Sequence, residues 1–326
     1  MHFVKPNPAD EGPVPGTNPI PGEGSPFHLA HLSDPHLSDL AGARFVDLLS
    51  KRLLGYLSWR IKRRRIHSPF VLEALLGDLE EMAPDHVALT GDLTHLGLPD
   101  EFRQAALWLG RLGPPERVTV IPGNHDAYVA APFRDTLALW APYLAGDEGP
   151  AGDYPSLRVR GPLALIGLSS ARPSPPFFAV GSLGESQLSR FEKLLEETRR
   201  SGLLRIVLIH HPPAPGSISW RKRLTDAPLF TEALSRQGAD LIIHGHSHIS
   251  MVHELVAGRW RVPVIGAPSA SYSGPDHRRS ARYNLFRFER RGAGWALILA
   301  VRAYSHVDRR FVAGEEKEFL LANPSS

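Results

Sequence analysis

Five short stretches of this chain carry side chains that bind metal ions, and each follows directly after a short apolar run. They are Asp34-Pro35-His36, Gly91-Asp92, Gly123-Asn124-His125-Asp126, His210-His211 and Gly245-His246-Ser247-His248. Apolar runs of this length, bounded by Gly and Pro, are typical of buried strands in an α/β sheet. Because ligands bind beyond the carboxyl ends of such strands, the five stretches are predicted to meet in one pocket.

The elements that would position these stretches alternate along the chain. Strands are predicted at 27–33, 86–90, 117–121, 205–209 and 240–243, each leading into one stretch. Helices are predicted at 70–82, 99–112, 131–143 and 225–237, with a capping box at Ser182 and Glu185 opening another. Further strands are expected at about 249–256, 260–266, 282–290 and 293–302. No repeat or linker interrupts this pattern, so 26–305 is predicted to be one domain.

Both ends of the chain differ in composition from this region. Residues 1–25 are rich in Pro and Gly with few large apolar side chains, which predicts a flexible tail. Residues 306–326 are expected to be a polar C-terminal tail. The chain has no run of about 18 apolar residues, which a transmembrane helix would need. It also lacks the pattern of a secretory signal, so a cytoplasmic location is expected.

The chain contains no cysteine. This excludes disulfides, thiolate zinc sites, iron–sulfur clusters and a cysteine nucleophile. Any metal must therefore be held by oxygen and imidazole nitrogen. Such ligands suit Mn, Fe, Zn, Ni or Mg rather than the soft metals.

The order of the five stretches resembles a known family. The series D-x-H, G-D, G-N-H-[DE], H and G-H-x-H, running from Asp34 to His248, is the motif set of the calcineurin-like metallophosphoesterases. Within that family the chain looks most like bacterial class III phosphodiesterases of cyclic nucleotides and glycerophosphodiesters. The resemblance implies an α/β fold: a four-layer αββα sandwich, in which two mixed β-sheets are flanked by helices.

The resemblance also implies a site for two divalent metal ions. Asp34, His36, Asp92 and His248 would hold one ion, and Asp92, Asn124, His210 and His246 the other. A bridging ligand needs an anionic group with two oxygens, which fits Asp92. Two such ions, with Mn, Fe or Zn favoured over Mg, would acidify a shared water, and the bridging hydroxide would attack phosphorus.

His125 is expected to lie beside the metal ions without binding them. In the family its counterpart faces the phosphate and the leaving group, where an imidazolium could donate a proton. His95 is expected either to orient a ligand or to lie on a surface loop. His244 should point away from the pocket, because side chains alternate along a strand. His67 has no supporting pattern.

A basic helical insert at about 45–67 separates the first two stretches. Residues 51–65 carry seven basic side chains and no acidic one, against a net charge of +3 for the chain. Phe45, Leu49, Leu53, Tyr56, Leu57 and Ile61 fall at helical spacing. Three interpretations remain open: a solvated helix end, contact of residues 51–66 with an anionic membrane, or a basic lip that guides a polyanionic substrate.

These observations favour a metal-dependent hydrolase of small phosphoric esters, and a phosphodiesterase in particular. The basic helix leaves open an alternative, a membrane-associated hydrolase of a lipid-linked phosphate or pyrophosphate. A non-catalytic scaffold on the same fold is disfavoured, because such proteins tend to lose ligands and all seven are present here. Nucleic acid is not an expected partner, since no separate nucleic-acid-binding module is recognisable.

Overall fold

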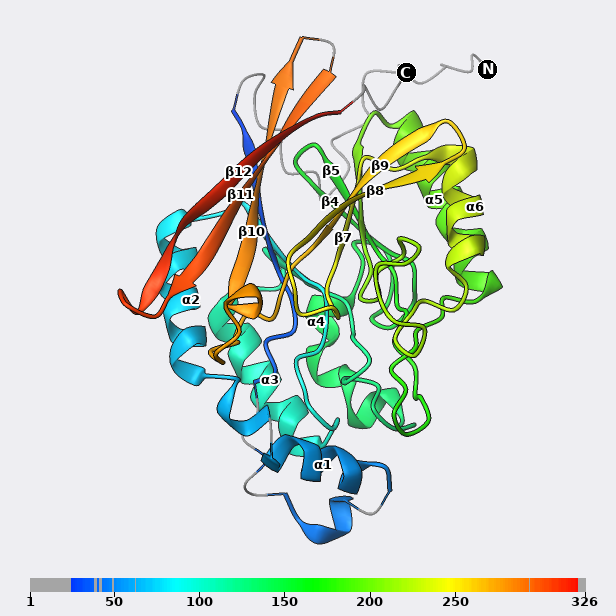
Figure 1. Cartoon of the computed structure of the whole chain (residues 1–326). Coiled ribbons are helices and arrows are strands. Elements are labelled where there is room, and N and C mark those ends of the chain that lie inside the picture. Colours follow the sequence, from blue (N-terminus) through cyan, green and yellow to red (C-terminus); the bar gives the residue numbers. More distant parts are fainter. Residues whose placement is uncertain are drawn as a thin grey trace, which may run out of the picture.

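The computed structural model describes residues 25–321 except 38, 39, 41, 42, 49, 62 and 293. Two six-stranded sheets form the centre of the molecule (Figure 1). The predicted N-terminal tail lies, apart from Ser25, outside the described residues. In the described part of the chain, no helix is long and apolar enough to cross a membrane.

The first sheet has the strand order β12-β11-β10-β1-β2-β3. Its strands are β1 (Phe27–Leu32), β2 (His86–Leu89), β3 (Val118–Val120), β10 (Arg282–Arg291), β11 (Gly294–Ser305) and β12 (Arg310–Leu321). Strands β1, β2 and β3 are parallel, whereas β10, β11 and β12 add antiparallel strands beyond β1. The first three strands therefore end at the same edge of the sheet.

The second sheet has the order β4-β5-β6-β7-β9-β8. Its strands are β4 (Ser156–Arg160), β5 (Leu163–Gly167), β6 (Leu204–Leu208), β7 (Leu241–His244), β8 (Met251–Ala257) and β9 (Trp260–Gly266). Strands β5, β6, β7 and β9 are parallel, and the two edge strands are antiparallel to their neighbours. Both sheets are thus mixed, as predicted.

The two sheets pack face to face through a common apolar core. Leu29 of β1 and Phe286 of β10 belong to the same buried cluster as Ile206 of β6 and Ile243 of β7. Side chains of β1 alternate between this core and the opposite face, where Ala30 and Leu32 pack under helices. Strand β1 is therefore buried on both faces, which explains its nearly continuous apolar sequence.

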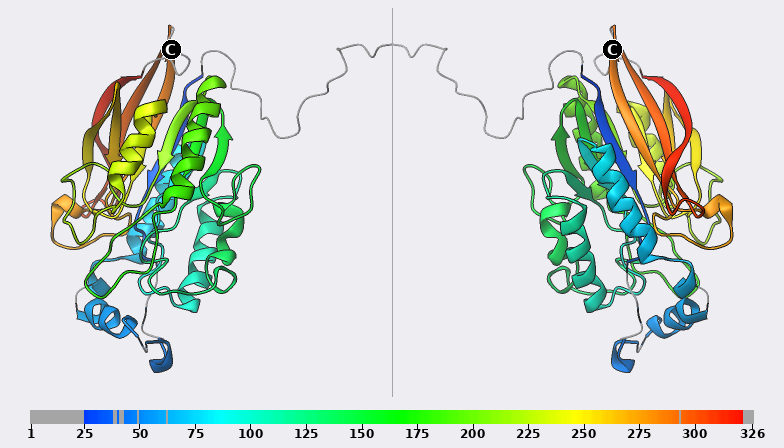
Figure 2. Two further views of the ribbon diagram at one scale, coloured as in Figure 1. Left: turned by 90° about the vertical axis from the view of Figure 1, so that its right-hand side faces the viewer. Right: turned by 90° about the vertical axis from the view of Figure 1, so that its left-hand side faces the viewer.

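Helices cover the outer face of each sheet (Figure 2). On the first sheet they are α2 (Pro69–Met82), α3 (Pro99–Leu112) and α4 (Ala141–Leu144), and on the second α5 (Glu185–Arg200) and α6 (Ala227–Gln237). Short 3-10 turns complete the chain at η2 (Phe45–Leu48), η3 (Arg63–Arg65), η4 (Phe133–Asp135), η5 (Leu137–Trp140) and η6 (His277–Arg279). The four-layer αββα sandwich is confirmed.

The insert differs from the expected helix. It contains one helix, α1 (Arg52–Ile61), between the turns η2 and η3, and α1 lies outside the sandwich (Figure 1). Trp59 is buried against the protein, whereas Leu53 and Ile61 are 41% and 75% exposed. The expected apolar stripe is therefore not the buried face. A different face of α1 is turned toward the protein, where Arg52 donates hydrogen bonds to the carbonyls of Leu96 and Gly97.

Three further sequence predictions were wrong. The helix predicted at 131–143 is instead the pair of 3-10 turns η4 and η5 followed by the short helix α4. Residues 310–321 of the predicted C-terminal tail form β12, which pairs with β11 along its length and buries Phe311 and Leu321. The charged residues between them, which suggested a tail, occupy a sheet edge open to solvent. The predicted capping box is also absent. Helix α5 begins at Glu185 with Gly184 before it, and the Ser182 hydroxyl donates instead to Asp226.

Candidate metal centre

The five stretches meet where strands of both sheets end. Asp34 and His36 follow β1, Asp92 follows β2 and Asn124 follows β3. From the second sheet, His210 follows β6, and His246 and His248 follow β7. The carboxyl ends of the parallel strands of both sheets thus face one place, as the sequence predicts.

Two groups of potential metal ligands share one carboxylate there. Asp34, His36, Asp92 and His248 form one group, and Asp92, His210 and His246 the other; within each, the ligand atoms lie within 4.8 Å of one another. Asn124 joins the second group, because its Oδ1 is 3.1 Å from His210 Nε2. The structure therefore brings all seven predicted ligands together, with Asp92 in both groups.

Backbone carbonyls fix the orientation of three of these imidazoles. Nδ1 of His36 donates to the Thr94 carbonyl at 2.9 Å, and Nδ1 of His210 to the Thr90 carbonyl at 2.6 Å. Nε2 of His246 donates to the Lys222 carbonyl at 3.0 Å. Each ring thereby presents its other nitrogen to the site, which is how proteins orient metal-binding histidines.

Two buried polar atoms of the first group lack a hydrogen bond. They are Oδ1 of Asp34 and Nε2 of His36. A buried polar atom without a partner costs about 1–3 kcal/mol. A divalent cation between these atoms would satisfy both, so the residues present fit a metal ion.

Electrostatics in the second group centres on Asp92 and His210. Burial alone would raise the pKa of Asp92, but the adjacent His210 and His125 hold it well below its usual range. Burial likewise opposes the charged form of His210, yet the carboxylate of Asp92 raises its pKa to about 9. Their side chains lie 3.4 Å apart, between Nε2 and Oδ2. A metal ion bound to His210 must therefore displace a proton from it.

Asp126 organises the loops that carry the bridging residue. Its Oδ2 accepts hydrogen bonds from the backbone N–H groups of Asp92 and Gly123, both at 2.9 Å. Its Oδ1 accepts from the N–H of Thr94 at 3.0 Å. The loop after β2 is thereby tied to the loop after β3. The sequence contained Asp126 in a motif, but spacing alone did not reveal this role.

Five of the seven predicted ligands have left-handed backbone conformations. Their φ angles are 51° at Asp34, 44° at His36, 57° at Asp92, 67° at His246 and 55° at His248. Such conformations cost of the order of 1–3 kcal/mol each and persist where the surrounding structure enforces them. The site therefore holds strained backbone at most of its ligands.

His125 lies beside the two groups and belongs to neither. Its Nδ1 donates to the His95 carbonyl at 2.5 Å, and its Nε2 lies 3.1 Å from Nη1 of Arg63. Burial lowers the pKa of His125 to about 4, so the ring is neutral at neutral pH. The imidazolium inferred from the sequence is not the form that this environment favours.

Three further histidines surround the centre. The His67 ring lies 4.7 Å from that of His36, and its Nδ1 is 2.8 Å from the Ser271 hydroxyl. His95 stacks on His36 at 4.8 Å, which favours the orienting role over a surface loop. His211 packs 4.4 Å from His246. His67 follows the insert rather than a strand, so no strand-end signal indicated it. His244 is buried and belongs to neither ligand group.

Comparison with known proteins agrees with this geometry. Residues 27–250 match the calcineurin-like phosphoesterase family. The chain is 28% identical over 201 residues to a probable cyclic nucleotide phosphodiesterase from Synechococcus, covering 61% of this chain and 69% of that protein. It is 28% identical over 188 residues to a glycerophosphodiester phosphodiesterase from Enterobacter lignolyticus, covering 57% of each. A dimetal phosphatase from Danio rerio shares the fold, with a TM-score of 0.60, 12% identity and coverage of 91% and 99%.

Replacing Gly91 by alanine should remove metal from the site. Gly91 has φ +91°, and a Cβ there would meet Gly123 N at 2.4 Å and His210 Nδ1 at 2.9 Å. Since neither backbone nor a held imidazole can move freely, Asp92 and His210 would be displaced. We expect Gly91→Ala to bind fewer than two metal ions per chain in elemental analysis and to melt at a lower temperature. Gly110→Ala is the matched control, because its Cβ would meet nothing within 4 Å. Full metal content in Gly91→Ala would contradict this.

Proposed function

The chain belongs to the calcineurin-like phosphoesterase family, and from this premise we propose that it is a phosphodiesterase that works with two divalent metal ions. The observation that carries the proposal is the pair of ligand groups sharing Asp92. The names of the relatives support a phosphodiester substrate, a cyclic nucleotide or a glycerophosphodiester. They lend no support to the lipid-linked alternative.

We propose that Asp34, His36, Asp92 and His248 hold one ion, and Asp92, Asn124, His210 and His246 the other. Two ions held in this way would polarise the phosphoryl oxygens and acidify a water between them. The mixture of imidazole and carboxylate ligands favours Mn, Fe or Zn, with Mg a weaker fit. The apolar core shared by the two sheets supports treating 26–305, extended by β12, as one catalytic domain.

The residues beside the ions have their own tasks in this proposal. The carbonyls of Thr94, Thr90 and Lys222 keep the imidazoles of His36, His210 and His246 aligned. His125 faces the bound ester with a neutral ring, whose Nδ1 proton is retained by the His95 carbonyl. Its Nε2 is therefore a hydrogen-bond acceptor. It can position a hydrogen-bond donor beside the departing oxygen, or it can take up a proton from solvent.

Hydrolysis of a simple diester tests the reaction. We expect metal-dependent release of nitrophenol from bis(p-nitrophenyl) phosphate, restored by Mn²⁺ after chelation. Asp92→Asn should lower kcat/KM by about a hundredfold or more, because a neutral amide bridges two cations poorly and one negative charge is lost. A folded, Mn²⁺-loaded chain that releases no nitrophenol would favour the scaffold over the enzyme.

The His125→Ala variant tests whether His125 binds a metal ion or acts on the substrate. We expect it to keep two metal ions per chain and to lose turnover by about 10²–10⁴-fold, the usual range for a positioned proton-transfer or hydrogen-bonding group. Elemental analysis and steady-state kinetics on the same sample check both parts. Loss of a metal ion would reassign His125 as a ligand.

We also propose that α1 contacts an anionic membrane surface. Leu53, Leu57 and Ile61 form an exposed apolar stripe along the helix, and Arg64 and Arg65 are exposed just after it. An apolar face with basic flanks suits the interface of an anionic leaflet. The cytoplasmic leaflet carries such charge, so this supports a cytoplasmic location at the inner membrane face.

Vesicle co-sedimentation tests the contact. The chain should sediment with vesicles of phosphatidylcholine and phosphatidylglycerol, and less with phosphatidylcholine alone, because basic residues are attracted to the anionic lipid. Leu57→Ser with Ile61→Ser should abolish sedimentation. Val307→Ser, at a 92% exposed apolar residue elsewhere, is the control and should change nothing. If sedimentation depends neither on the lipid charge nor on the α1 substitutions, the membrane contact is contradicted and α1 is a solvated helix.

A further inference from the structure

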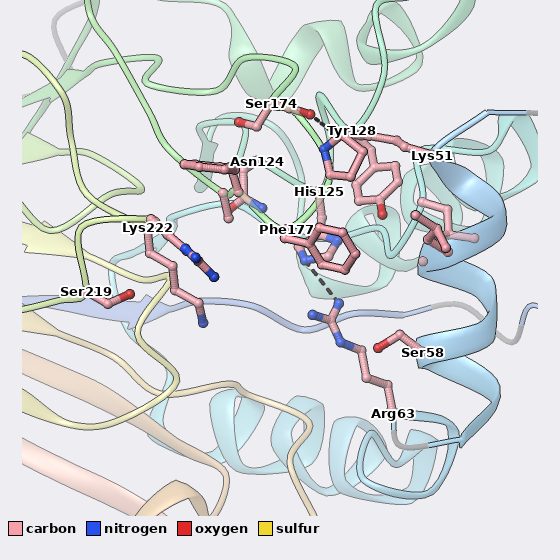
Figure 3. A pocket seen from close by; sticks show the side chains of 17 residues that line it. Lys51, Ser58, Arg63, Asn124, His125, Tyr128, Ser174, Phe177, Ser219 and Lys222 are labelled. Atoms are coloured by element: carbon pink, nitrogen blue, oxygen red, sulfur yellow. Dashed lines mark hydrogen bonds between the residues drawn. The ribbon is translucent and has the colours of Figure 1, made fainter.

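Arg63 leaves the basic insert and reaches the catalytic centre. It is the first of three consecutive arginines in η3, of which Arg64 and Arg65 are exposed. Figure 3 shows its side chain extending from the insert toward His125, with Nη1 3.1 Å from Nε2. The insert therefore contributes a guanidinium to a site otherwise built from strand ends.

The hydrogen bond between Arg63 and His125 has a defined direction. A guanidinium has donors only, so Nε2 of His125 must accept. Nδ1 must then carry the ring proton, which it donates to the His95 carbonyl. Arg63 is thus held by a neutral imidazole. In the described part of the chain, this is the one hydrogen bond that its guanidinium makes, and no carboxylate forms a salt bridge with it. Most of its donors remain free to bind an anion.

A cavity of about 400 Å³ adjoins Arg63, Asn124 and His125. Four basic residues line it, and none of its lining residues is acidic: Lys51, Arg63, Arg221 and Lys222. Lys51 is already engaged, since its Nζ donates to the Ser174 carbonyl at 2.7 Å and lies 4.2 Å from the centre of the Tyr128 ring. Arg221 stacks over Trp220 at 5.2 Å. Among the described residues, Arg63 and Lys222 are the two lining cations without such a carbonyl or aromatic contact, so their charges are the most available to a ligand.

Lys222 reaches the cavity from the opposite side to Arg63 (Figure 3). Its carbonyl accepts the hydrogen bond from His246 Nε2, which places the residue directly beside the centre. Lys222 is exposed, whereas Arg63 is half-buried. Because the two cations lie on opposite sides of the cavity, an anion bound between them could pair with both.

The number of negative charges on a substrate determines whether it can pair with these two cations as well as with the metal ions. A simple phosphodiester has one negative charge, which the metal ions themselves would attract. It would bring no second anionic group to Arg63 and Lys222, although both line the cavity beside the metal centre. A pyrophosphate diester has a second phosphate, and its oxygens match the fork geometry of a guanidinium. Arg63, at the end of the insert, therefore supports the third interpretation, a basic lip for a polyanion, in addition to the membrane contact proposed for the exposed face of α1.

We propose that Arg63 and Lys222 bind a second anionic group of the substrate, so that the site selects a pyrophosphate diester over a simple phosphodiester. This inference rests on the proposed function, because it names the substrate class of the same site. The insert thereby acts as a selectivity element, with Arg63 as a substrate-binding residue contributed by it.

Two matched ligands test the selectivity directly. P1,P2-dimethyl pyrophosphate and dimethyl phosphate differ by one phosphate, and both can be titrated calorimetrically into the Mn²⁺-loaded chain. We expect the pyrophosphate diester to bind at least tenfold more tightly. Arg63→Gln should weaken its binding by about 10–100-fold, the loss typical of a hydrogen bond to a charged group, with little effect on dimethyl phosphate. Lys222→Gln should act in the same direction.

Controls separate substrate binding from structural support. Arg65→Gln changes an exposed arginine two residues away and should leave both affinities unchanged. Arg63→Lys keeps the charge without the fork and should give an intermediate affinity. Metal content and melting temperature are measured for every variant. Equal affinity for the two ligands in the unmodified chain would overturn the inference. So would equal loss of both ligands in Arg63→Gln, or loss of metal in Arg63→Lys.

The outcome is also distinguishable from a failure of the proposed function. A chain that hydrolyses bis(p-nitrophenyl) phosphate but shows no preference for the pyrophosphate diester refutes the selectivity alone. A chain that prefers the pyrophosphate diester in calorimetry but hydrolyses neither ester refutes the catalysis and leaves the anion-binding pair in place.

Discussion

A single buried carboxylate governs the arrangement of this molecule. Asp92 belongs to both groups of potential metal ligands, and those groups draw their other members from four further strand ends. The two sheets must therefore stay in one relative position, since a small slide between them would separate Asp34 and Asp92 on one sheet from His210, His246 and His248 on the other. The shared apolar core between the sheets, including Leu29, Ile206 and Phe286, provides this rigidity.

The same carboxylate explains why the loops around it are so constrained. Most ligands sit in left-handed backbone, which the unaided chain would avoid. Hydrogen bonds from Asp92 N, Thr94 N and Gly123 N to Asp126 hold one such loop, and the Asp34 carboxylate holds another by accepting from His246 N. The backbone strain is confined to these loops, and it is offset by hydrogen bonds and packing around the ligands.

The sequence was sufficient to predict the positions of those site residues that directly follow a strand. A ligand placed directly after an apolar run, such as Asp92 or His210, is located by the strand itself, and the parallel order brings such residues together. Arg63 begins the 3-10 turn η3 and His67 follows it, and no periodicity there indicates which side chain turns inward. The buried face of α1 was missed for a related reason: Trp59 and the hydrogen bonds of Arg52 outweighed the more regular stripe of Leu53, Leu57 and Ile61. β12 was missed because an edge strand tolerates the run of charges around Glu316.

The insert packs against neighbouring loops through a small apolar cluster formed by Leu40, Leu48, Trp59, Leu96 and Leu98. This cluster lies apart from the cores of the sandwich, so residues of the insert can change, or its length can vary, without disturbing either sheet. The insert can therefore be exchanged while the metal centre stays the same. Descendants of one ancestral gene could diverge in what they recognise through this segment alone, while the metal chemistry is inherited intact. For the protein engineer it marks the place where specificity can be exchanged with the least risk to folding.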